Sequence, residues 1–468
     1  MTTLLWFRDD LRTHDHEALT AASVNGPVVA VWVREEPALH DDTVDSPTTP
    51  ARLGPRPLGA ATRWWYHRSL DILQNNLREL GIPLLFARGD AREIIPHLAR
   101  ELQVDIVRWS RRYAWSSRML DAEIKTALKN QGIAAHSHRG ALLVEPFDIA
   151  PASSTYYQVF TPFYRAASQM GVDRPLPAPS TRHDDAPLSA TTVTCAFEEL
   201  ELLDTAPAWW ENTVAKHWSP GERSARKRLD DMEMWLPDYR TTRDNPNDVN
   251  STSQLSPYLR AGNISPREVL RVAYELADAG EVPSDDASAF MRQLYWREFS
   301  WHLLYHQPQM ETQPLKEQFR AFPYQPDPEL LKAWQRGRTG IALVDAGMMQ
   351  LWHTGWMHNR VRMVVASLLS KNLLQPWRDG EAWFWDTLVD ADEANNPISW
   401  QWVAGCGADA APYFRIFNPE LQQKKFDPEG KYVAHWLAQQ DGLPAAPIVD
   451  LKESRREALA AYEQTKSS

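Results

Sequence analysis

Short apolar runs alternate with longer amphipathic stretches along the first third of the chain. The longer stretches carry apolar residues at helical spacing, as Trp64, Leu70 and Leu73 do in one of them. The pattern predicts helices at Ala60–Leu80 and Ala91–Leu102, and strands at Leu4–Phe7, Val28–Val33, Pro83–Ala87, Val104–Trp109 and Ile133–His136. Strands that alternate with helices predict an α/β domain with a doubly wound parallel sheet over residues 1–140.

The rest of the chain has a different pattern. Residues Pro146–Pro187 are rich in Pro, Ser and Ala with weak periodicity, which predicts a long inter-domain linker within residues 141–208. From about Trp209 strand signals fade, and residues 209–468 are predicted to form an all-α domain. Its predicted helices are Ser219–Trp235, Ser265–Ala279, Ala287–Tyr305, Pro328–Arg336, Ala342–Trp352, Trp356–Leu374, Gly380–Leu388 and Lys431–Leu437.

Composition narrows the class of protein. Of the 468 residues, 43% are hydrophobic and 24% charged, which is typical of a globular protein rather than a disordered one. Two cysteines are too few for a disulfide framework or a cysteine-based zinc site, so we expect a reducing, cytoplasmic location. The N-terminus is charged where a signal peptide is apolar, and no run reaches the length of a membrane span.

Charge and tryptophan content bear on the ligand. The net charge of −11 argues against a general nucleic-acid-binding surface, although a local basic groove stays compatible with it. Tryptophan is unusually frequent at 21 residues, 15 of them at or beyond Trp209. P-loop, zinc-protease and serine-hydrolase motifs are absent from the sequence. The Gly405–Ala410 segment matches a dinucleotide fingerprint in form only, because it follows no strand, and it predicts a tight glycine turn.

The stretch Asn359–Met363 is the first candidate for a ligand site. On a helix Asn359, Arg362 and Met363 share one face, while Arg360 points elsewhere. Such a face suits neither solvent nor an apolar core, and it continues into apolar residues that would desolvate its polar groups. A buried ion pair is the alternative, and a polar ligand site is favoured.

Each of three other stretches allows both a ligand-binding and a purely structural interpretation. Asp390–Trp402 combines carboxylates, amides and two tryptophans, which suits a planar ligand or a turn with Asx caps before packed aromatics. Thr252–Ser256 precedes a helix and can cap it or cradle a phosphate, capping being commoner. Basic residues around Tyr413 and Phe414 fit a nucleic-acid surface or a solvated face: Arg415, Lys424, Lys425 and Lys431.

Taken together, these motifs resemble the DNA photolyase/cryptochrome family, and within it the bacterial-type photolyases of cyclobutane pyrimidine dimers. The resemblance covers the whole chain and is densest across Gly355–Met363, Trp400–Gly405 and Ala408–Pro419. It implies a Rossmann-like antenna domain, a linker and a helical domain that binds FAD. The implied activity is light-dependent repair of UV-damaged DNA by electron transfer from reduced FAD to a flipped-out dimer.

The resemblance also implies roles for individual residues. Asn396 corresponds to the amide that faces flavin N5, where Asn favours repair because sensor members often carry Asp or Cys. The other residues implied to hold FAD are Tyr239, Thr252, Ser253, Gln254, Leu255, Ser256, Asn359, Arg362, Asp390, Ala391 and Asp392, with Arg362 paired to Asp390. Those implied to contact lesion or DNA are Trp296 and Trp402, which stack on the dimer, with Arg243, Gln293, Arg297, Asn359, Arg360, Met363 and Arg415.

The family commonly relays electrons to the flavin through three tryptophans. Trp400 and Trp377 match the inner two, whereas Tyr324 occupies the outer position, so we predict slower photoreduction than in a three-tryptophan relay. Gln293 stands where many members have Glu, and Gln254 where Arg is frequent.

The antenna chromophore stays undetermined. Ser116 and Ser117 replace the Asn-Glu pair that grips a folate in other members, and Thr312 replaces their Lys, so methenyltetrahydrofolate is not favoured. A deazaflavin in the cleft near Trp6, Arg8 and Trp109, or no antenna at all, remains open.

Three rival functions define the tests. A cryptochrome-like light sensor is disfavoured by Asn396 and by the end of the chain at Ser468 without a regulatory extension. A (6-4) photolyase needs adjacent histidines where this chain has His358 and Asn359. A nucleotide-binding α/β protein with a helical appendage would lack flavin absorbance. We expect a monomer that binds damaged DNA and no membrane.

Overall fold

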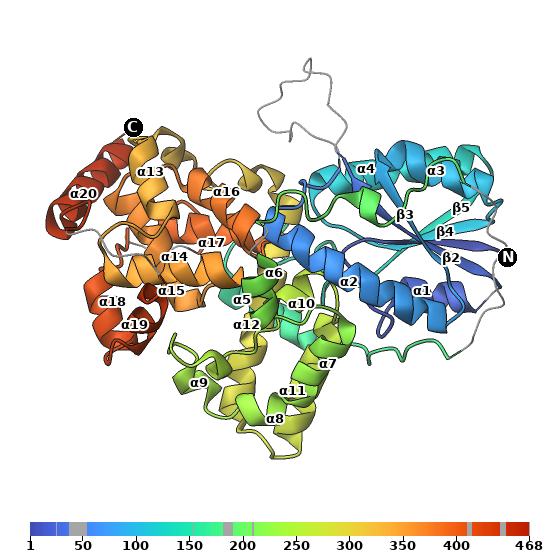
Figure 1. Ribbon diagram of the computed structural model, residues 1–468, viewed down its shortest axis with the longest axis horizontal. Helices are drawn as coiled ribbons and strands as arrows, with labels where there is room; N and C mark the ends of the chain where they lie inside the picture. The colour runs from blue at the N-terminus through green and yellow to red at the C-terminus, as the bar shows by residue number, and fades with distance from the viewer. Residues whose placement is uncertain are drawn as a thin grey trace.

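The computed structural model describes residues 1–24, 26–36, 54–152, 154–180, 191–207, 210–409, 414–439 and 446–467. A five-stranded parallel sheet lies in the N-terminal part, with the order β3-β2-β1-β4-β5 (Figure 1). All five predicted strands are confirmed within a few residues: β1 (Thr3–Phe7), β2 (Val28–Glu35), β3 (Leu84–Gly89), β4 (Ile106–Ser110) and β5 (Ala134–His138).

Helices cover both faces of this sheet, so the prediction of a doubly wound α/β domain is confirmed. Alternate side chains of β1 serve the two faces, because successive residues of a strand point to opposite sides. Leu4 and Trp6 join the cluster under α3 and α4, whereas Leu5 and Phe7 join the cluster under α1 and α2. The four helices are α1 (Glu17–Ser23), α2 (Ala60–Glu79), α3 (Ala91–Glu101) and α4 (Trp115–Asn130).

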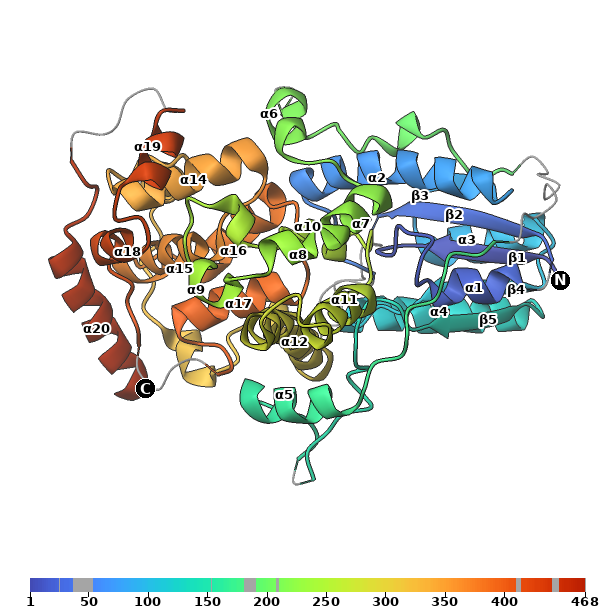
Figure 2. The ribbon, with the colours of Figure 1, turned by 90° about the horizontal axis from the view of Figure 1, so that it is seen from below.

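The predicted linker contains a helix that its weak periodicity did not reveal. This helix, α5 (Phe160–Gln169), lies along the long helix α12 (Ser284–His306), as Figure 2 shows. Phe160 and Phe163 of α5 are buried and pack against Phe299 of α12. The linker is therefore part of the wall of the helical domain.

The C-terminal half is helical, as predicted; the proposed boundary at residue 209 lies outside the described residues. Ser265 caps α11 (Pro266–Asp278), since its hydroxyl accepts from the Glu268 N–H at 3.1 Å. Within the described ranges no helix combines the length and apolar character needed to cross a bilayer. The helices are α6 (Trp210–His217), α7 (Glu222–Asp230), α8 (Met232–Trp235), α9 (Tyr239–Thr242), α10 (Ser256–Arg260), α11 (Pro266–Asp278), α12, α13 (Pro328–Gln335), α14 (Ala342–Thr354), α15 (Asn359–Ser367), α16 (Trp377–Thr387), α17 (Asn395–Ala404), α18 (Pro419–Phe426), α19 (Lys431–Leu437) and α20 (Leu451–Ser467).

Several predicted helices have different bounds, and some were missed. The stretch Ser219–Trp235 is divided at Asp231 into α7 and α8. The stretch Trp356–Leu374 becomes helical only at Asn359 and ends in a π-helix, Leu368–Asn372. In the C-terminal half, helices α6, α9, α17, α18 and α20 were not predicted. For α17 the reason is its sequence, in which polar and apolar residues are spread around the helix, so it lacks amphipathic periodicity.

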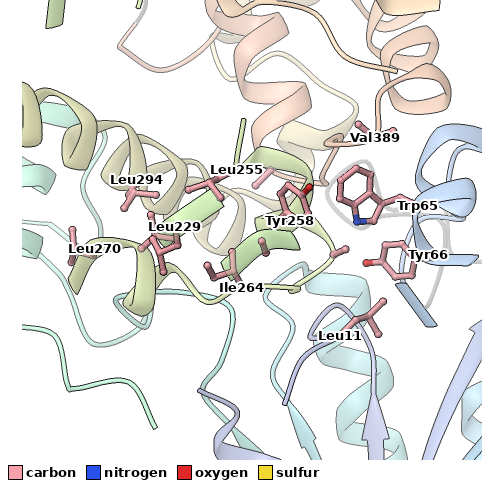
Figure 3. Close-up of a cluster of buried hydrophobic side chains, with 14 of the residues drawn as sticks. Leu11, Trp65, Tyr66, Leu229, Leu255, Tyr258, Ile264, Leu270, Leu294 and Val389 are labelled. Atoms are coloured by element: carbon pink, nitrogen blue, oxygen red, sulfur yellow. The ribbon is translucent and has the colours of Figure 1, made fainter. Parts of the chain in front are cut away.

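One apolar cluster joins the two parts of the molecule (Figure 3). Trp65 of α2 meets Tyr258 of α10 edge to face, with ring centroids 4.9 Å apart. Leu255, at the start of α10, belongs to the same cluster. Gly262 has φ +67°, and a Cβ there would lie 2.1 Å from the Asp9 carbonyl, so only glycine allows this close approach. The candidate site is thus held against the α/β domain by a shared core.

Candidate functional site

An arginine side chain holds the backbone of the turn Thr252–Ser256 in place. Arg228 of α7 donates to the carbonyls of Thr252, at 2.8 Å, and Ser253, at 3.0 Å. The Ser253 hydroxyl accepts from the Leu255 N–H at 3.3 Å, as in a capping turn. Gln254 has φ +52°, and its side chain donates back to Val249 rather than outward. The turn is therefore locally closed, and Ser256 is the residue that reaches another element.

Ser256 leads to the predicted ion pair. Its hydroxyl donates to Asp390 Oδ2 at 2.7 Å. Arg362 of α15 meets the same carboxylate with two parallel bonds, Nη1–Oδ1 at 3.1 Å and Nη2–Oδ2 at 2.8 Å. The Asp390 side chain is 4% exposed, so the pair is largely desolvated and its geometry is well defined. The predicted pairing of Arg362 with Asp390 is confirmed, and it unites α10, α15 and the segment before α17.

The Asp392 carboxylate caps the start of α17, and its implied role toward FAD stays a prediction. Its Oδ1 accepts from the N–H groups of Ala394, at 2.8 Å, and Asn395, at 2.6 Å, and its Oδ2 accepts from the Asn395 side chain. Asx capping of α17 is thus how this carboxylate is used. The neighbouring Ala391 carbonyl accepts from Arg260 at 2.7 Å, which ties the segment to α10.

Asn396, on the first turn of α17, presents one polar atom to its surroundings. Its Nδ2 group donates to Glu381 Oε1 at 2.7 Å and to the Glu381 carbonyl at 3.0 Å. An amide NH₂ group has two hydrogens, so both are used, and the two oxygen acceptors fix which end of the amide is nitrogen. The amide oxygen is what remains for a ligand.

The segment before α15 is organised by His358. Its Nδ1 accepts from the Arg360 N–H at 3.2 Å, and its Nε2 donates to the Arg243 carbonyl at 3.0 Å. Burial lowers the pKa of His358 to about 4, so the ring is neutral at pH 7. This residue joins the end of α9, with Tyr239 at its start, to the start of α15.

The predicted separation of Arg360 from Met363 is wrong. Arg360 Nη1 lies 3.8 Å from the Met363 sulfur, and Nη2 donates to Asp244 at 2.6 Å. The long arginine side chain curls along the helix toward the residue three positions on, because such residues are neighbours on the surface. Asn359 is exposed.

The two tryptophans assigned to the lesion each pack on a phenylalanine. Trp296 of α12 is half-buried and stacks on Phe160, with centroids 3.6 Å apart. Trp402 of α17 is half-buried and meets Phe417 at 6.4 Å, and the Arg415 guanidinium lies 4.9 Å from that same ring. Helices α12 and α17 are in contact, so the two tryptophans belong to adjoining surfaces.

Two other residues of α12 were assigned to the lesion or DNA, Gln293 and Arg297, and their side chains make different contacts. Gln293, one turn before Trp296, donates to the Ala289 carbonyl and stays half-buried beside it. Arg297 donates to the Ala141 carbonyl at 2.9 Å and pairs with Glu298 at 3.0 Å. One residue along a helix turns the side chain by about 100°, so Arg297 faces the linker and does not join the lesion-side residues.

The basic residues near the chain's end are only partly a surface patch. Arg415, Lys424 and Lys425 are exposed, and Lys431 pairs with Glu429. Phe414 is buried, stacked on Tyr462 at 4.6 Å, and Tyr413 lies outside the described residues. Lys371 of the π-helix donates to the Arg415 carbonyl at 2.5 Å, and burial lowers the pKa of Lys371 to about 7.

Of the predicted relay residues, Trp400 and Trp377 are buried and Tyr324 is half-buried, and the three are not in ring contact with one another. Trp400 packs against Phe384, at 5.0 Å, and Trp334, at 6.0 Å. Among the ring contacts of the described chain, none joins Trp400 to Trp377, or Trp377 to Tyr324. Trp334, fully buried, was missed because its helical periodicity marks only a core position.

A cavity of about 260 Å³ lies at the carboxyl ends of β1, β2 and β4. Arg8 lines it as predicted, whereas Trp6 and Trp109 are fully buried, with Arg8 4.7 Å above the Trp6 ring. The lining also includes Trp32, Arg34, Glu35, Arg56, Tyr66 and Arg112. Ser116 and Ser117 are buried in α4 and are not among the lining residues.

Comparison with known proteins identifies the class to which this fold and site belong. Family models match residues 3–180 as DNA photolyase and residues 290–464 as FAD binding domain of DNA photolyase. A deoxyribodipyrimidine photo-lyase of Agrobacterium fabrum is 42% identical, covering 99% of this chain and 98% of that protein. Cryptochrome-2 of Arabidopsis thaliana is 35% identical, over 97% of this chain and 74% of its own length.

A solved structure agrees. A bacterial class III photolyase from Agrobacterium tumefaciens superposes with a TM-score of 0.89 at 40% identity, covering 100% of this chain and 98% of that one. The chain belongs to the photolyase/cryptochrome family.

Proposed function

We propose that this protein repairs cyclobutane pyrimidine dimers in DNA by a light-dependent reaction. The observation that carries the proposal is the Asn396 amide, whose oxygen is left for a ligand in a domain that also holds a bidentate ion pair and two half-buried tryptophans. All of these residues lie in the segment that matches the FAD binding domain of DNA photolyase. One curated relative of the chain is named a deoxyribodipyrimidine photo-lyase.

FAD fits the donor set. The Arg362 guanidinium and the Asn396 amide oxygen offer a cation and a hydrogen-bond acceptor to a planar, polar ring system. Ser256, Thr252, Ser253, Gln254 and Leu255 form the turn beside them, with Tyr239 and Asn359 at the adjoining helix starts. When bound and fully reduced, FAD supplies one electron to the dimer after absorbing blue light and takes it back once the ring has opened.

The remaining work of the protein is to bind and orient the lesion. Trp296 and Trp402 offer flat apolar surfaces on which an extruded dimer stacks, at about 1–3 kcal/mol per base. Gln293 lies one helical turn from Trp296, the Met363 sulfur lies 3.8 Å from Arg360 Nη1, and Arg243, Arg360 and Arg415 meet phosphates. No general acid or base is required, which accords with the absence of the common catalytic motifs.

DNA is bound by a local basic rim in this proposal. The net charge of −11 opposes general attraction to a polyanion, so affinity depends on a few arginines and falls steeply with salt. Residues 1–140 form the antenna domain, 141–208 the linker and 209–468 the catalytic domain of a cytoplasmic monomer.

The cavity at the sheet edge is the proposed site of a second chromophore. Ligands of open α/β sheets bind outside the carboxyl ends of the strands, where this cavity lies. Trp32 and Tyr66 offer ring surfaces, and Arg8 and Arg34 offer cations. A deazaflavin suits this lining, whereas the buried Ser116 and Ser117 do not supply the usual folate contacts.

Repair of the (6-4) photoproduct is a weaker candidate. That reaction needs a histidine acid near the lesion, and both ring nitrogens of His358 are engaged by Arg243 and Arg360. The low pKa of this ring, near 4, also keeps it from holding a proton at neutral pH.

The deciding experiment uses the purified, FAD-loaded and reduced protein with an oligonucleotide that carries one thymine dimer. We expect loss of the dimer under blue light and none in the dark. An intact dimer under blue light, with FAD bound, would instead favour a light sensor like the cryptochrome relatives. A chain without flavin absorbance would favour a nucleotide-binding protein.

A further inference from the structure

Arg56, in a loop of the α/β domain, contacts residues of the helical domain that lie next to Asn396. The Arg56 Nη1 atom donates to Glu381 Oε1 of α16 at 2.6 Å, and its backbone N–H donates to Glu393 Oε1 at 2.7 Å. The guanidinium also lies 4.2 Å from the centre of the Trp385 ring. Two side-chain contacts and one backbone contact therefore fix this residue, although 325 positions separate it from Glu381 in sequence.

Glu381 is the point at which Arg56 meets Asn396. One carboxylate oxygen, Oε1, accepts both from Arg56 and from the Asn396 Nδ2 group. The Glu381 side chain is 5% exposed, and Arg56 is the cation that the structure pairs with it. A carboxylate this deeply buried needs an opposite charge to stay ionised, because desolvation favours its neutral form.

We propose that Arg56 is a positioning residue that acts through Glu381 to orient the Asn396 amide. This inference rests on the proposed function, since the Asn396 amide oxygen meets flavin N5 only when FAD is bound. With Arg56 present, Glu381 is an acceptor on both sides, and the Asn396 nitrogen must face it. The amide oxygen then faces the ligand, where it accepts from the hydrogen that a reduced flavin carries on N5.

Without Arg56 the constraint on the Asn396 amide is weaker. The Glu381 side chain is no longer held beside Asn396, so the main-chain carbonyl of Glu381 is the one acceptor that stays in place for the Asn396 Nδ2 group. With a single fixed acceptor the Asn396 amide rotates in part of the molecules and presents NH₂ to the flavin. Reduced flavin loses a hydrogen-bond acceptor, so its reduced state is less stable and returns to the oxidised state faster.

The test compares Arg56→Gln with Arg88→Gln, which removes another arginine of the α/β domain that pairs with Glu36 and Glu201 instead. The readout is the rate at which light-reduced flavin regains its oxidised absorbance in air, together with the FAD content of the purified protein. We expect Arg56→Gln to keep its FAD and to reoxidise about fivefold faster, the factor of one hydrogen bond. Arg88→Gln should match the wild type, and Arg56→Lys should restore most of the slow reoxidation.

A double variant separates action through Glu381 from a direct effect. In the Glu381→Gln background the amide side chain cannot ionise, so adding Arg56→Gln should change the rate no further. An equal effect of Arg56→Gln in both backgrounds would overturn the proposal, as would loss of FAD from Arg56→Gln or an unchanged rate. These outcomes differ from failure of the proposed function, which would appear as a wild-type protein that binds FAD and leaves dimers intact.

Discussion

The indole of Trp296 lies parallel to the ring of Phe160, with centroids 3.6 Å apart and planes 7° apart. Phe160 comes from helix α5 in the linker, and the guanidinium of Arg292 lies 5.0 Å from its ring. One face of the proposed lesion-stacking tryptophan is thus covered by the protein. The linker helix backs Trp296, so a base that stacks on the other face meets a surface that is already held in place.

Replacing Phe160 with Leu should weaken binding of dimer-containing DNA about two- to tenfold, because aromatic pairs contribute roughly 0.5–1.5 kcal/mol beyond area burial. FAD content should not change. The measurement is affinity for dimer-containing and intact duplexes in the dark. Phe163→Leu is the control, since that ring packs on Phe299 and His302 instead. Equal losses in the two variants would show that the stack has no specific role.

Neutralising Asp390 should impair flavin binding. Asp390→Asn leaves the Arg362 charge without its carboxylate partner in a desolvated site, a change that costs a few kcal/mol in comparable pairs. We expect FAD affinity to fall about 10- to 100-fold by fluorescence titration of the apoprotein. Glu429→Gln, which breaks the exposed pair with Lys431, should leave FAD affinity unchanged. Retention of full affinity in Asp390→Asn would exclude Arg362 and Asp390 from the cofactor site.

His358 should make stability depend on pH. Its pKa is about 4 in the folded chain and about 6.5 when unfolded, so the unfolded state binds the proton more tightly. The stabilisation is complete above pH 6.5 and is lost as pH falls toward 4, about 2 kcal/mol of it between pH 7 and pH 5. Denaturant unfolding at both pH values should show this loss in the wild type and a smaller one in His358→Gln. Identical losses in the two proteins would contradict the assignment.

The outer relay position should limit photoreduction. Burial raises the pKa of the Tyr324 phenol well above its usual value, and the same desolvation disfavours a charged tyrosine radical cation, so oxidation of Tyr324 requires its proton to leave together with the electron. Tyr324→Trp should therefore speed light-driven reduction of oxidised flavin, and Tyr324→Phe should slow or abolish any contribution of this position. Transient absorption follows both. A wild-type protein that already yields a solvent-exposed tryptophan radical efficiently would refute the prediction.

The sequence predicted what local patterns and opposite charges determine. All five strands follow from short apolar runs, and the Arg362–Asp390 pair was implied by the family resemblance, which agrees with the need of two opposite charges for each other in an apolar setting. Contacts between distant segments could not be predicted, because no periodicity links Phe160 to Trp296 or Arg56 to Glu381. Asp392 shows a different limit: the same composition suits a ligand and a helix cap, and its hydrogen bonds go to the cap.

The most direct test of the account is the number of dimers split per bound FAD. Protein reduced beforehand, freed of excess reductant and kept under inert gas is illuminated with a large excess of dimer-containing oligonucleotide. Because the electron returns after each cycle, the account predicts many dimers repaired per FAD with no reductant consumed. At most one dimer repaired per FAD, or none, would contradict it.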